Sequence, residues 1–201
     1  DFKIQLGQVS TAEGGTELRV RDNVDSPWRS WMKVGPEENL GALEFTKDGK
    51  SVFVESSIGS DTARVLERNL GTGAEKLIAH SPEVDSGDVM INPRTKMVEA
   101  VSFEPGRRQW KVIDPSVQPD FDALAKVHDG DFSIVSRDRA DKTWLAAYTS
   151  DRGPVRFYSW DRSAKKSTFL FTAQPKLENL TLAEMKAVVI PSRDGLKLNS
   201  Y

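Results

Sequence analysis

Histidine is the side chain most often used for metal binding and proton transfer near neutral pH. This chain of 201 residues has two histidines, His80 and His128, and no cysteine. A structural metal site needs about four ligands, usually histidine or cysteine, whereas the surrounding segments HSPEVDSGD and HDGD offer only carboxylates. We therefore interpret both histidines as half-exposed residues of turns that follow the last strand of a repeat, and we expect no metal ion or other cofactor.

Catalysis by a nucleophilic serine is the second kind of chemistry that the residues could support. In many hydrolases it occupies a sharp Gly-x-Ser-x-Gly turn that exposes its hydroxyl beside a base. This pentapeptide does not occur in the sequence, and the most similar stretch, SIGSDTAR at 57–64, lacks the second glycine. We therefore assign no catalytic residue to this sequence.

Two arginines are candidates for binding an anionic ligand. Arg107 lies in the turn EPGRRQW and Arg152 in the turn SDRGP. A guanidinium group presents paired N–H donors that fit a carboxylate. An exposed arginine that forms a salt bridge with a neighbouring acid is the other interpretation, and the residue types leave both open.

The overall composition excludes several classes of partner. Hydrophobic residues make up 38% and charged residues 29% of the chain, and the net charge is −2. Such a balance argues against a nucleic-acid or anionic-membrane surface, and no apolar run approaches the roughly 20 residues of a membrane-spanning helix. The residues leave the compartment open, with the cytoplasm favoured over the periplasm. The starting sequence DFKIQLGQVS and the alternating end LKLNSY lead us to expect a piece of a longer protein.

Landmark residues recur along the chain at steps of 45 to 48. Four serines close similar apolar segments: Ser10, Ser57, Ser102 and Ser150. An acid or amide follows each serine after 11 or 12 residues: Asp22, Asn69, Asp114 and Asp161. We interpret these four as residues whose side chains accept hydrogen bonds from backbone N–H groups of the next turn.

The pattern of apolar and turn residues in each repeat predicts four short strands separated by turns. The segment LEFTKDGKSVFVESS at 43–57 is the first hairpin of one repeat, and we expect Asp48 and Gly49 to adopt the positive φ angles of its turn. The expected fourth strands are 30–34, 76–79, 123–127 and 168–172. We expect the five tryptophans to pack between repeats: Trp28, Trp31, Trp110, Trp144 and Trp160.

A period near 45 with four strands per repeat is typical of a β-propeller, because each blade is a small sheet that its neighbours cover. The sequence therefore predicts an all-β partial propeller of four-stranded antiparallel blades. We place a partial blade at 1–38 and complete blades at 39–82, 83–128 and 129–175. An all-β sandwich with an accidental period stays open as a third possibility.

The pattern changes after Pro175. The segment KLENLTLAEM at 176–185 predicts a short helix. Two alternating stretches then flank Asp194 and Gly195, a strong hairpin signal. We interpret 176–201 as a linker and the start of a new domain.

Three segments carry a resemblance to a known family. LGALEFTKDGKSVFVESS and RVLERNLGTGAEKLIA resemble the propeller repeat of the prolyl oligopeptidase family of serine peptidases, especially its dipeptidyl and acylaminoacyl peptidase branches. MKAVVIPSRDGLKLNSY is similar to the hairpin that opens the α/β-hydrolase domain of these enzymes. The resemblance implies a parent that cleaves short peptides with a Ser-Asp-His triad on the hydrolase domain, while the propeller excludes folded proteins. No triad residue can be assigned here, so the chain should be inactive alone.

The resemblance also suggests substrate-binding residues. Dipeptidyl branches hold the amino terminus of a substrate with paired glutamates, and Glu37 and Glu38 form such a pair in GPEENLG. They lie in a proline-containing connection, which favours a solvated turn. Arg107 and Arg152 occupy equivalent hairpin tips, and they would meet a peptide carboxylate if that end of the propeller faces the hydrolase.

Two functional hypotheses follow. The first is a non-catalytic propeller segment that gates the access of short peptides to a catalytic domain. The alternative is a TolB-like propeller that serves as a protein-binding scaffold. Because end blades expose an apolar face, we also expect copies of the chain to associate with each other.

Overall fold

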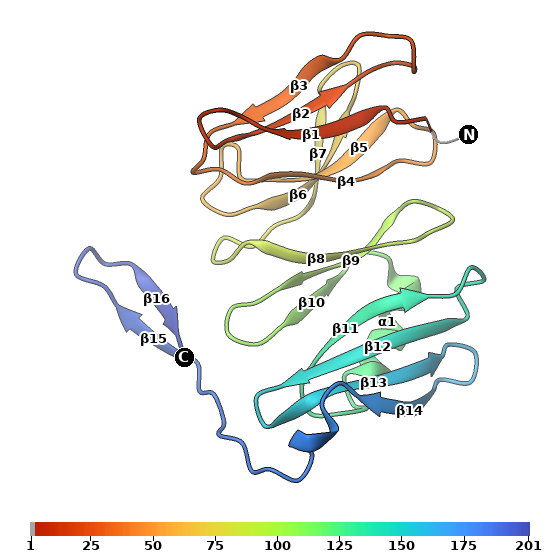
Figure 1. Cartoon of the computed structure of the whole chain (residues 1–201), viewed down its shortest axis with the longest axis vertical. Coiled ribbons are helices and arrows are strands. Elements are labelled where there is room, and N and C mark those ends of the chain that lie inside the picture. Colours follow the sequence, from red (N-terminus) through yellow and green to blue (C-terminus); the bar gives the residue numbers. More distant parts are fainter. Residues whose placement is uncertain (1–2) are drawn as a thin grey trace. The chain divides into compact units, whose positions relative to one another are not determined.

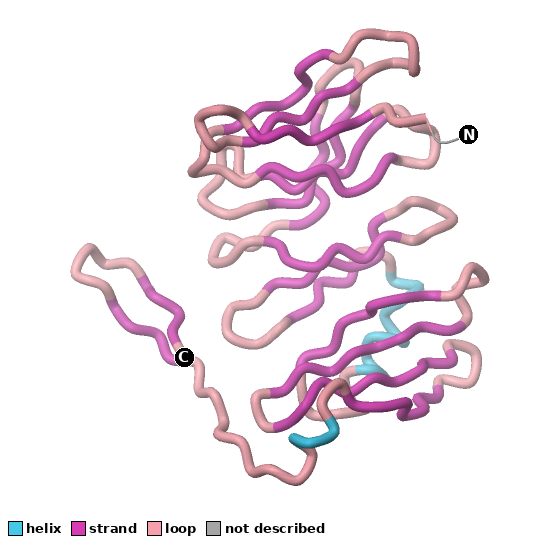
Figure 2. Tube along the Cα trace, viewed as in Figure 1, coloured by secondary structure: helices cyan, strands magenta, loops and turns pink. Residues whose placement is uncertain are grey.

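The computed structural model describes residues 3–201 and consists mainly of β-strands in separate antiparallel sheets (Figure 1, Figure 2). Residues 1 and 2 of the predicted partial blade lie outside the described residues. The chain divides into two compact units, 1–104 and 105–201. Each unit is described by itself.

The first unit contains a three-stranded meander, a four-stranded meander and a hairpin. The first sheet has the order β1-β2-β3, with bounds Leu6–Ser10, Thr16–Val20 and Arg29–Val34. The second has the order β4-β5-β6-β7, with bounds Leu40–Phe45, Ser51–Ser56, Arg64–Asn69 and Glu75–Ala79. The hairpin pairs β8 with β9, with bounds Ser86–Ile91 and Val98–Phe103.

The second unit combines one complete meander with short helices and a separate hairpin. It begins with β10, η1 and α1, with bounds Gln109–Val112, Pro115–Val117 and Gln118–Leu124. The sheet order is β11-β12-β13-β14, with bounds Asp131–Arg137, Thr143–Ser150, Gly153–Asp161 and Lys166–Thr172. After η2 come β15 and β16, with bounds Pro175–Leu177, Val188–Pro191 and Lys197–Ser200.

One apolar cluster joins the first two sheets of the first unit. It takes buried residues from β2 and β3 on one side and from β4, β5 and β6 on the other: Leu18, Met32, Val34, Leu40, Val52, Val54 and Leu66. Each sheet therefore buries one face against its neighbour, as the propeller prediction requires. Among residues 3–201 the strands form separate sheets of two to four strands. The prediction of antiparallel propeller blades is confirmed, and the open possibility of a sandwich is wrong.

Polar side chains also connect successive sheets of the first unit. The Ser86 hydroxyl on β8 donates to Glu55 Oε1 on β5 over 2.6 Å, and Lys96 Nζ lies 2.6 Å from Glu44 Oε2 on β4. Burial raises the pKa of Glu55, an effect that the hydrogen bond from Ser86 opposes. A partly buried carboxylate thus has a donor across the sheet junction.

The turn chemistry predicted at Asp48 and Gly49 is correct for the glycine alone. Gly49 has the positive φ of 69°, but the prediction for Asp48 is wrong, because its carboxylate instead accepts the backbone N–H of Lys50 over 3.1 Å. In the equivalent turns of the later repeats the positive φ belongs to Lys96 and Asp141. These turns therefore close without glycine.

The acid or amide after each third strand behaves as predicted in three repeats. Backbone N–H groups two or three residues onward donate to the side chains of three residues: Asn69, Asp114 and Asp161. The prediction is wrong for Asp22, whose carboxylate lies 3.3 Å from Arg29. In that turn Asn23 accepts the N–H of Asp25 instead.

Helix α1 replaces the fourth strand that we expected at 123–127. The helix has proline in its first turn and buries Asp120, Phe121 and Leu124. Phe121 packs edge-to-face against Trp110 and Trp144, with ring centroids 5.3 and 6.2 Å apart. The alternation in ALAKV therefore could not reveal the aromatic pocket that stabilises a helix here.

The helix predicted at 176–185 is also wrong. Only η2 forms at its start, and most of the segment is exposed. An isolated helix of this length is marginal without an apolar face to bury. Helix-favouring residues alone are therefore not enough here.

A buried ionic network anchors α1 to the last sheet. The Asp120 carboxylate is fully buried and accepts hydrogen bonds from Trp160 Nε1 at 2.8 Å and Arg162 Nε at 3.0 Å, and it contacts Lys165. Arg162 Nη1 also lies 2.6 Å from Asp141 Oδ2. One guanidinium group thus bridges two buried carboxylates.

The same network explains the buried tryptophans. Trp144 Nε1 donates to Asp141 Oδ1 over 2.7 Å, and the Arg162 guanidinium lies 4.4 Å from the centre of the Trp144 ring. Trp144 and Trp160 are fully buried, so the prediction of packing tryptophans is correct for them. It is wrong for Trp28, which precedes β3 and is 42% exposed.

We predict that Asp120→Ala destabilises the second unit by about 3 kcal/mol or more, because it leaves Arg162 without one of its buried carboxylates. Asp122→Ala on the same helix is the matched control, since Asp122 is exposed and contacts only Gln118 in the hydrogen bonds described. Native-state hydrogen exchange of the β12 and β13 amides measures both. Equal protection in the two variants would contradict the role of the network.

Candidate functional site

The two arginines proposed from the sequence as ligand-binding candidates both contact one short loop of the second unit. Arg107 Nε lies 2.9 Å from Asp131 Oδ1, and Arg152 Nη2 contacts Asp129 Oδ2. The arginine side chains are 61% and 52% exposed. The salt-bridge interpretation is therefore what the geometry shows, and both guanidinium groups keep surface available to solvent.

The loop that contacts both arginines requires glycine at its centre, at position 130. Gly130 has φ +144°, and a Cβ there would lie 2.6 Å from the carbonyl oxygen of Thr149. Any side chain would clash with that backbone. The turn that separates Asp129 from Asp131 therefore depends on glycine at position 130. The hydrogen bond to Asp131 raises the pKa of the Arg107 guanidinium group, so Arg107 stays protonated.

The carboxyl-terminal segment contacts the residues that immediately precede the two arginines. The Asp151 carboxylate accepts the backbone N–H of Met185 over 2.5 Å, and the carbonyl of Gly106 accepts the Tyr201 hydroxyl over 2.8 Å. The bond from Met185 is the largest cause that lowers the pKa of Asp151. We call the loops around Arg107, Asp129–Asp131 and Arg152 the arginine–aspartate cluster.

The paired glutamates form an exposed turn of the first unit. Glu38 Oε2 accepts the N–H of Gly35 over 3.3 Å, and the N–H of Glu38 donates to the carbonyl of Gly35 at the same distance. Glu37 and Glu38 are both exposed. The geometry is that of the solvated turn between β3 and β4.

The two histidines have different surroundings. His80 follows β7 as predicted, and its Nε2 lies 3.2 Å from Thr62 Oγ1. The prediction for His128 is wrong, because it follows α1 rather than a strand, and its Nδ1 lies 2.6 Å from the carbonyl of Asp129. Within residues 3–201, no group of three His, Cys, Asp or Glu side chains is arranged to hold a metal ion.

The structure brings Ser60 of SIGSDTAR near His80, a juxtaposition that sequence spacing did not reveal. Ser60 Oγ lies 3.5 Å from His80 Nε2. This distance is at the limit of a hydrogen bond, and no acidic side chain is among the hydrogen-bond partners described for His80 in residues 3–201. The pair therefore lacks the acid that would orient a catalytic histidine.

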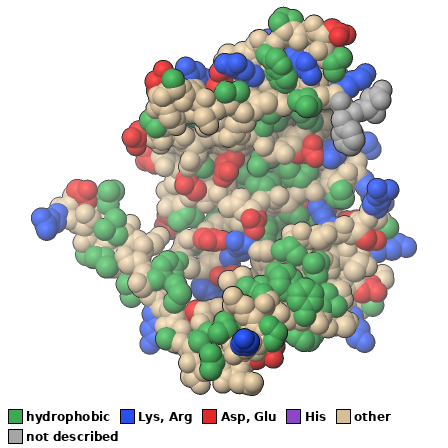
Figure 3. Space-filling model, in the orientation of Figure 1, with side chains coloured by type: hydrophobic (Ala, Val, Ile, Leu, Met, Phe, Trp, Pro, Cys, Tyr) green, Lys and Arg blue, Asp and Glu red, His purple; other side chains and the backbone are tan. Residues whose placement is uncertain are grey.

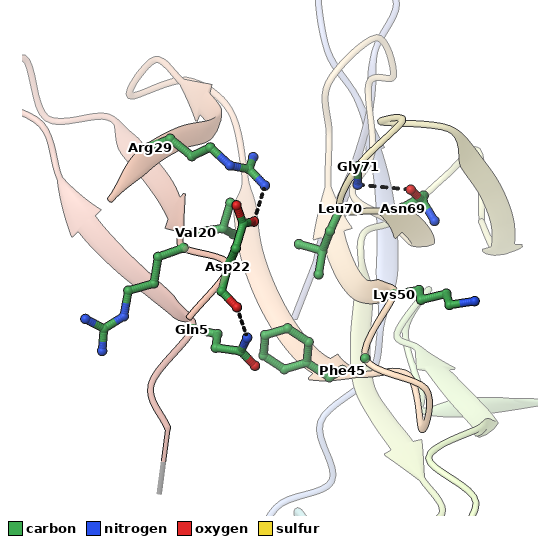
Figure 4. Close-up of a pocket in the computed structure, with 11 residues that line it drawn as sticks. Gln5, Val20, Asp22, Arg29, Phe45, Lys50, Asn69, Leu70 and Gly71 are labelled. Carbon is green, nitrogen blue, oxygen red and sulfur yellow. Dashed lines mark hydrogen bonds and ion pairs between the residues drawn. The ribbon is translucent and has the colours of Figure 1, made fainter. Parts of the chain in front are cut away.

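A pocket of about 340 Å³ in the first unit was missed entirely (Figure 4). Turns and strand ends of the first two sheets line it: Gln5, Val20, Arg21, Asp22, Arg29, Phe45, Gly49, Lys50, Asn69, Leu70 and Gly71. In Figure 4, Arg29 meets Asp22 on one side, and Phe45 and Leu70 lie across from them. The turn residues were the only feature of the sequence that could have indicated this pocket, because turns at the same end of neighbouring blades lie close together.

Among the residues described, 3–201, no helix is long and apolar enough to cross a membrane.

The sheets and their order define a class of protein, a β-propeller segment made of antiparallel meander blades. No protein-family model matches the sequence. The chain is 34% identical over its full length to dipeptidyl aminopeptidase BIII of Pseudoxanthomonas mexicana, and it spans 29% of the length of that protein. It is 22% identical over 90% of its length to dipeptidyl peptidase family member 6 of Caenorhabditis elegans, of which it spans 25%.

Solved structures show the same fold. A puromycin-hydrolyzing peptidase of Mycobacterium tuberculosis matches 99% of this chain with a TM-score of 0.62 and 14% identity, over 33% of its own length. Prolyl oligopeptidase B of Galerina marginata matches 92% of this chain with a TM-score of 0.62 and 15% identity, over 26% of its own length. The relatives are dipeptidyl peptidases and the structural neighbours include members of the prolyl oligopeptidase family, which is consistent with a propeller segment of this family.

We predict that the anchor between Asp151 and Met185 weakens in acid. Because the pKa of Asp151 is lowered, the anchor is at full strength above the ordinary aspartate pKa of about 3.9 and is lost as the pH falls through the lowered value. The Met185 amide resonance, followed by NMR from pH 7 to pH 2, should shift with a midpoint below that value.

Asp151→Asn should abolish this shift, whereas Asp122→Asn should leave it unchanged. A Met185 amide that titrates identically in Asp151→Asn would show that another group controls it.

Proposed function

We propose that this chain is the part of a prolyl-oligopeptidase-family serine peptidase that gates the access of short peptides to a catalytic domain. The observation that carries the proposal is the pair of contacts from the arginine–aspartate cluster to the carboxyl-terminal segment, Asp151 to Met185 and Gly106 to Tyr201. A peptide that passes these loops would meet both arginines.

The hairpin β15–β16 supports the proposal. It is a two-stranded sheet in which Val189 and Leu198 are 58% and 47% exposed, and Figure 3 shows hydrophobic side chains along it. An isolated hairpin is marginally stable in water. We propose that it is the opening hairpin of an α/β-hydrolase domain, as the sequence resemblance implies.

The arginine–aspartate cluster suggests how a peptide would be recognised. Arg107 and Arg152 are each paired with one exposed or half-exposed aspartate, and exposed pairs of this kind contribute little stability. A peptide carboxylate could therefore replace an aspartate at low cost. In our proposal the two arginines contact the carboxylate of an incoming peptide.

The alternative of a non-catalytic scaffold also has a structural neighbour. TolB from Acinetobacter baumannii matches 81% of this chain with a TM-score of 0.50 and 12% identity. Such a likeness shows the fold alone. The 34% identity to a dipeptidyl aminopeptidase over the whole chain favours the peptidase.

The test joins this segment to the sequence that follows it in its gene. We predict that Asp151→Ala combined with Tyr201→Phe raises the rate for a peptide of about 30 residues relative to a dipeptidyl chromogenic substrate, because the loops are no longer tied to the carboxyl-terminal segment. Glu83→Ala, in an exposed loop of the first unit, is the matched control.

An unchanged ratio of the two rates in the double variant would contradict gating. The 201-residue chain alone should give no turnover of aminoacyl or acylaminoacyl chromogenic substrates. Turnover that survives repurification would contradict the assignment of the chain as non-catalytic.

We also propose that copies of this chain associate through the last sheet. Edge strand β14 exposes three consecutive large apolar side chains, Phe169, Leu170 and Phe171, at 47%, 45% and 53%. Figure 3 shows hydrophobic side chains gathered over this sheet. An apolar edge of this kind favours pairing with another chain.

Light scattering should show dimers or larger species at high concentration, and Leu170→Lys should shift them toward monomer because it places a charge on the edge. Lys176→Ala, on an exposed residue outside the strand, is the control. A chain that stays monomeric at high concentration would contradict this proposal.

A further inference from the structure

We propose that the pocket in Figure 4 binds a carboxylate group carried on a small apolar body, such as the terminal residue of a peptide. The pocket lies wholly within the first unit, so this inference does not depend on the proposed peptidase activity or on the arginine–aspartate cluster. Three features of the pocket support it: the charge, an exposed ion pair and an apolar wall.

The charged groups that line the pocket are mostly cationic. Arg21, Arg29 and Lys50 face a single acid, Asp22. Arg21 is already engaged, since its Nε donates to the carbonyl of Ile4 over 2.7 Å, and Lys50 extends away from the cavity in Figure 4. Arg29 is therefore the group available to contact a ligand, while the other two cations add a favourable field for an anion.

The ion pair that occupies Arg29 is easily exchanged. Arg29 Nη2 lies 3.3 Å from Asp22 Oδ1, and the two side chains are 47% and 78% exposed. Such exposed surface pairs contribute little stability. The backbone of Asp22 is held separately, because Gln5 Nε2 donates to its carbonyl over 2.8 Å. The Asp22 carboxylate can thus turn to solvent when a ligand carboxylate contacts Arg29, and the turn itself keeps its place.

The apolar wall sets the size and character of the ligand body. Val20 is buried, and Phe45 and Leu70 pack against the core cluster shared by the two sheets. Small-molecule sites commonly combine such a wall with a few polar groups that fix orientation. A volume of about 340 Å³ accommodates one apolar side chain with its carboxylate, and it is too small for a folded partner.

The experiment titrates the full chain with N-acetyl-leucine and with N-acetyl-leucinamide, which differ only in the carboxylate. Chemical shifts of the Gly49, Asn69 and Gly71 amides report binding at the pocket. We expect the acid to bind and the amide to bind at least about tenfold more weakly, the size of one charge-assisted hydrogen-bond pair. Equal binding of the two compounds would overturn the proposal.

Three variants separate the role of Arg29 from a general effect of charge. Arg29→Gln should weaken the acid about tenfold without changing the amide. Arg94→Gln, which removes an exposed cation from the β8–β9 turn, should leave both unchanged. Asp22→Asn should tighten the acid several-fold because Arg29 loses its competing partner.

The opposite signs expected for Arg29→Gln and Asp22→Asn keep the test decisive if one variant folds poorly. Binding of the acid that is unaffected by Asp22→Asn and by Arg29→Gln would overturn the proposal. So would loss of binding that is equal in Arg94→Gln and Arg29→Gln, since that result would reflect net charge alone.

Discussion

The contact between Arg162 and two buried carboxylates is the constraint on which the second unit depends. Asp120 comes from α1 and Asp141 from the turn between β11 and β12, and a single guanidinium group reaches both. Two buried acids without this arginine would be strongly unfavourable. The arginine therefore holds α1 against the last sheet through Asp120.

A second contact holds the end of α1 near the loop that follows it. Tyr148 donates its hydroxyl to the carbonyl of Leu124 over 2.7 Å, which holds the last turn of α1 against β12. Five residues after Leu124 the chain enters Asp129–Asp131, the loop that receives Arg107 and Arg152. A series of contacts thus runs from the buried ion pairs of Arg162, through the end of α1, to the exposed ion pairs of Arg107 and Arg152.

Much of the fold could be predicted because its signals are local. Alternating apolar residues and turn residues recur every 45 to 48 positions, and the Asn69 and Asp161 side chains bond N–H groups only two or three residues away. The two predicted secondary-structure elements that do not form, at 123–127 and 176–185, lie where packing outweighs local preference. A buried aromatic cluster stabilises a helix in the first segment, and no packing surface supports one in the second.

The sequence by itself determined most of the strands and turns and the blade repeat, since each depends on residues within a few positions of one another. It also placed Arg107 and Arg152 on equivalent hairpin tips. Only the tertiary structure decided that these tips meet one aspartate loop and that Arg29 shares a pocket with Phe45 and Leu70. Such contacts join residues from different strands and turns, and their geometry depends on how sheets and helix pack, which no local pattern encodes.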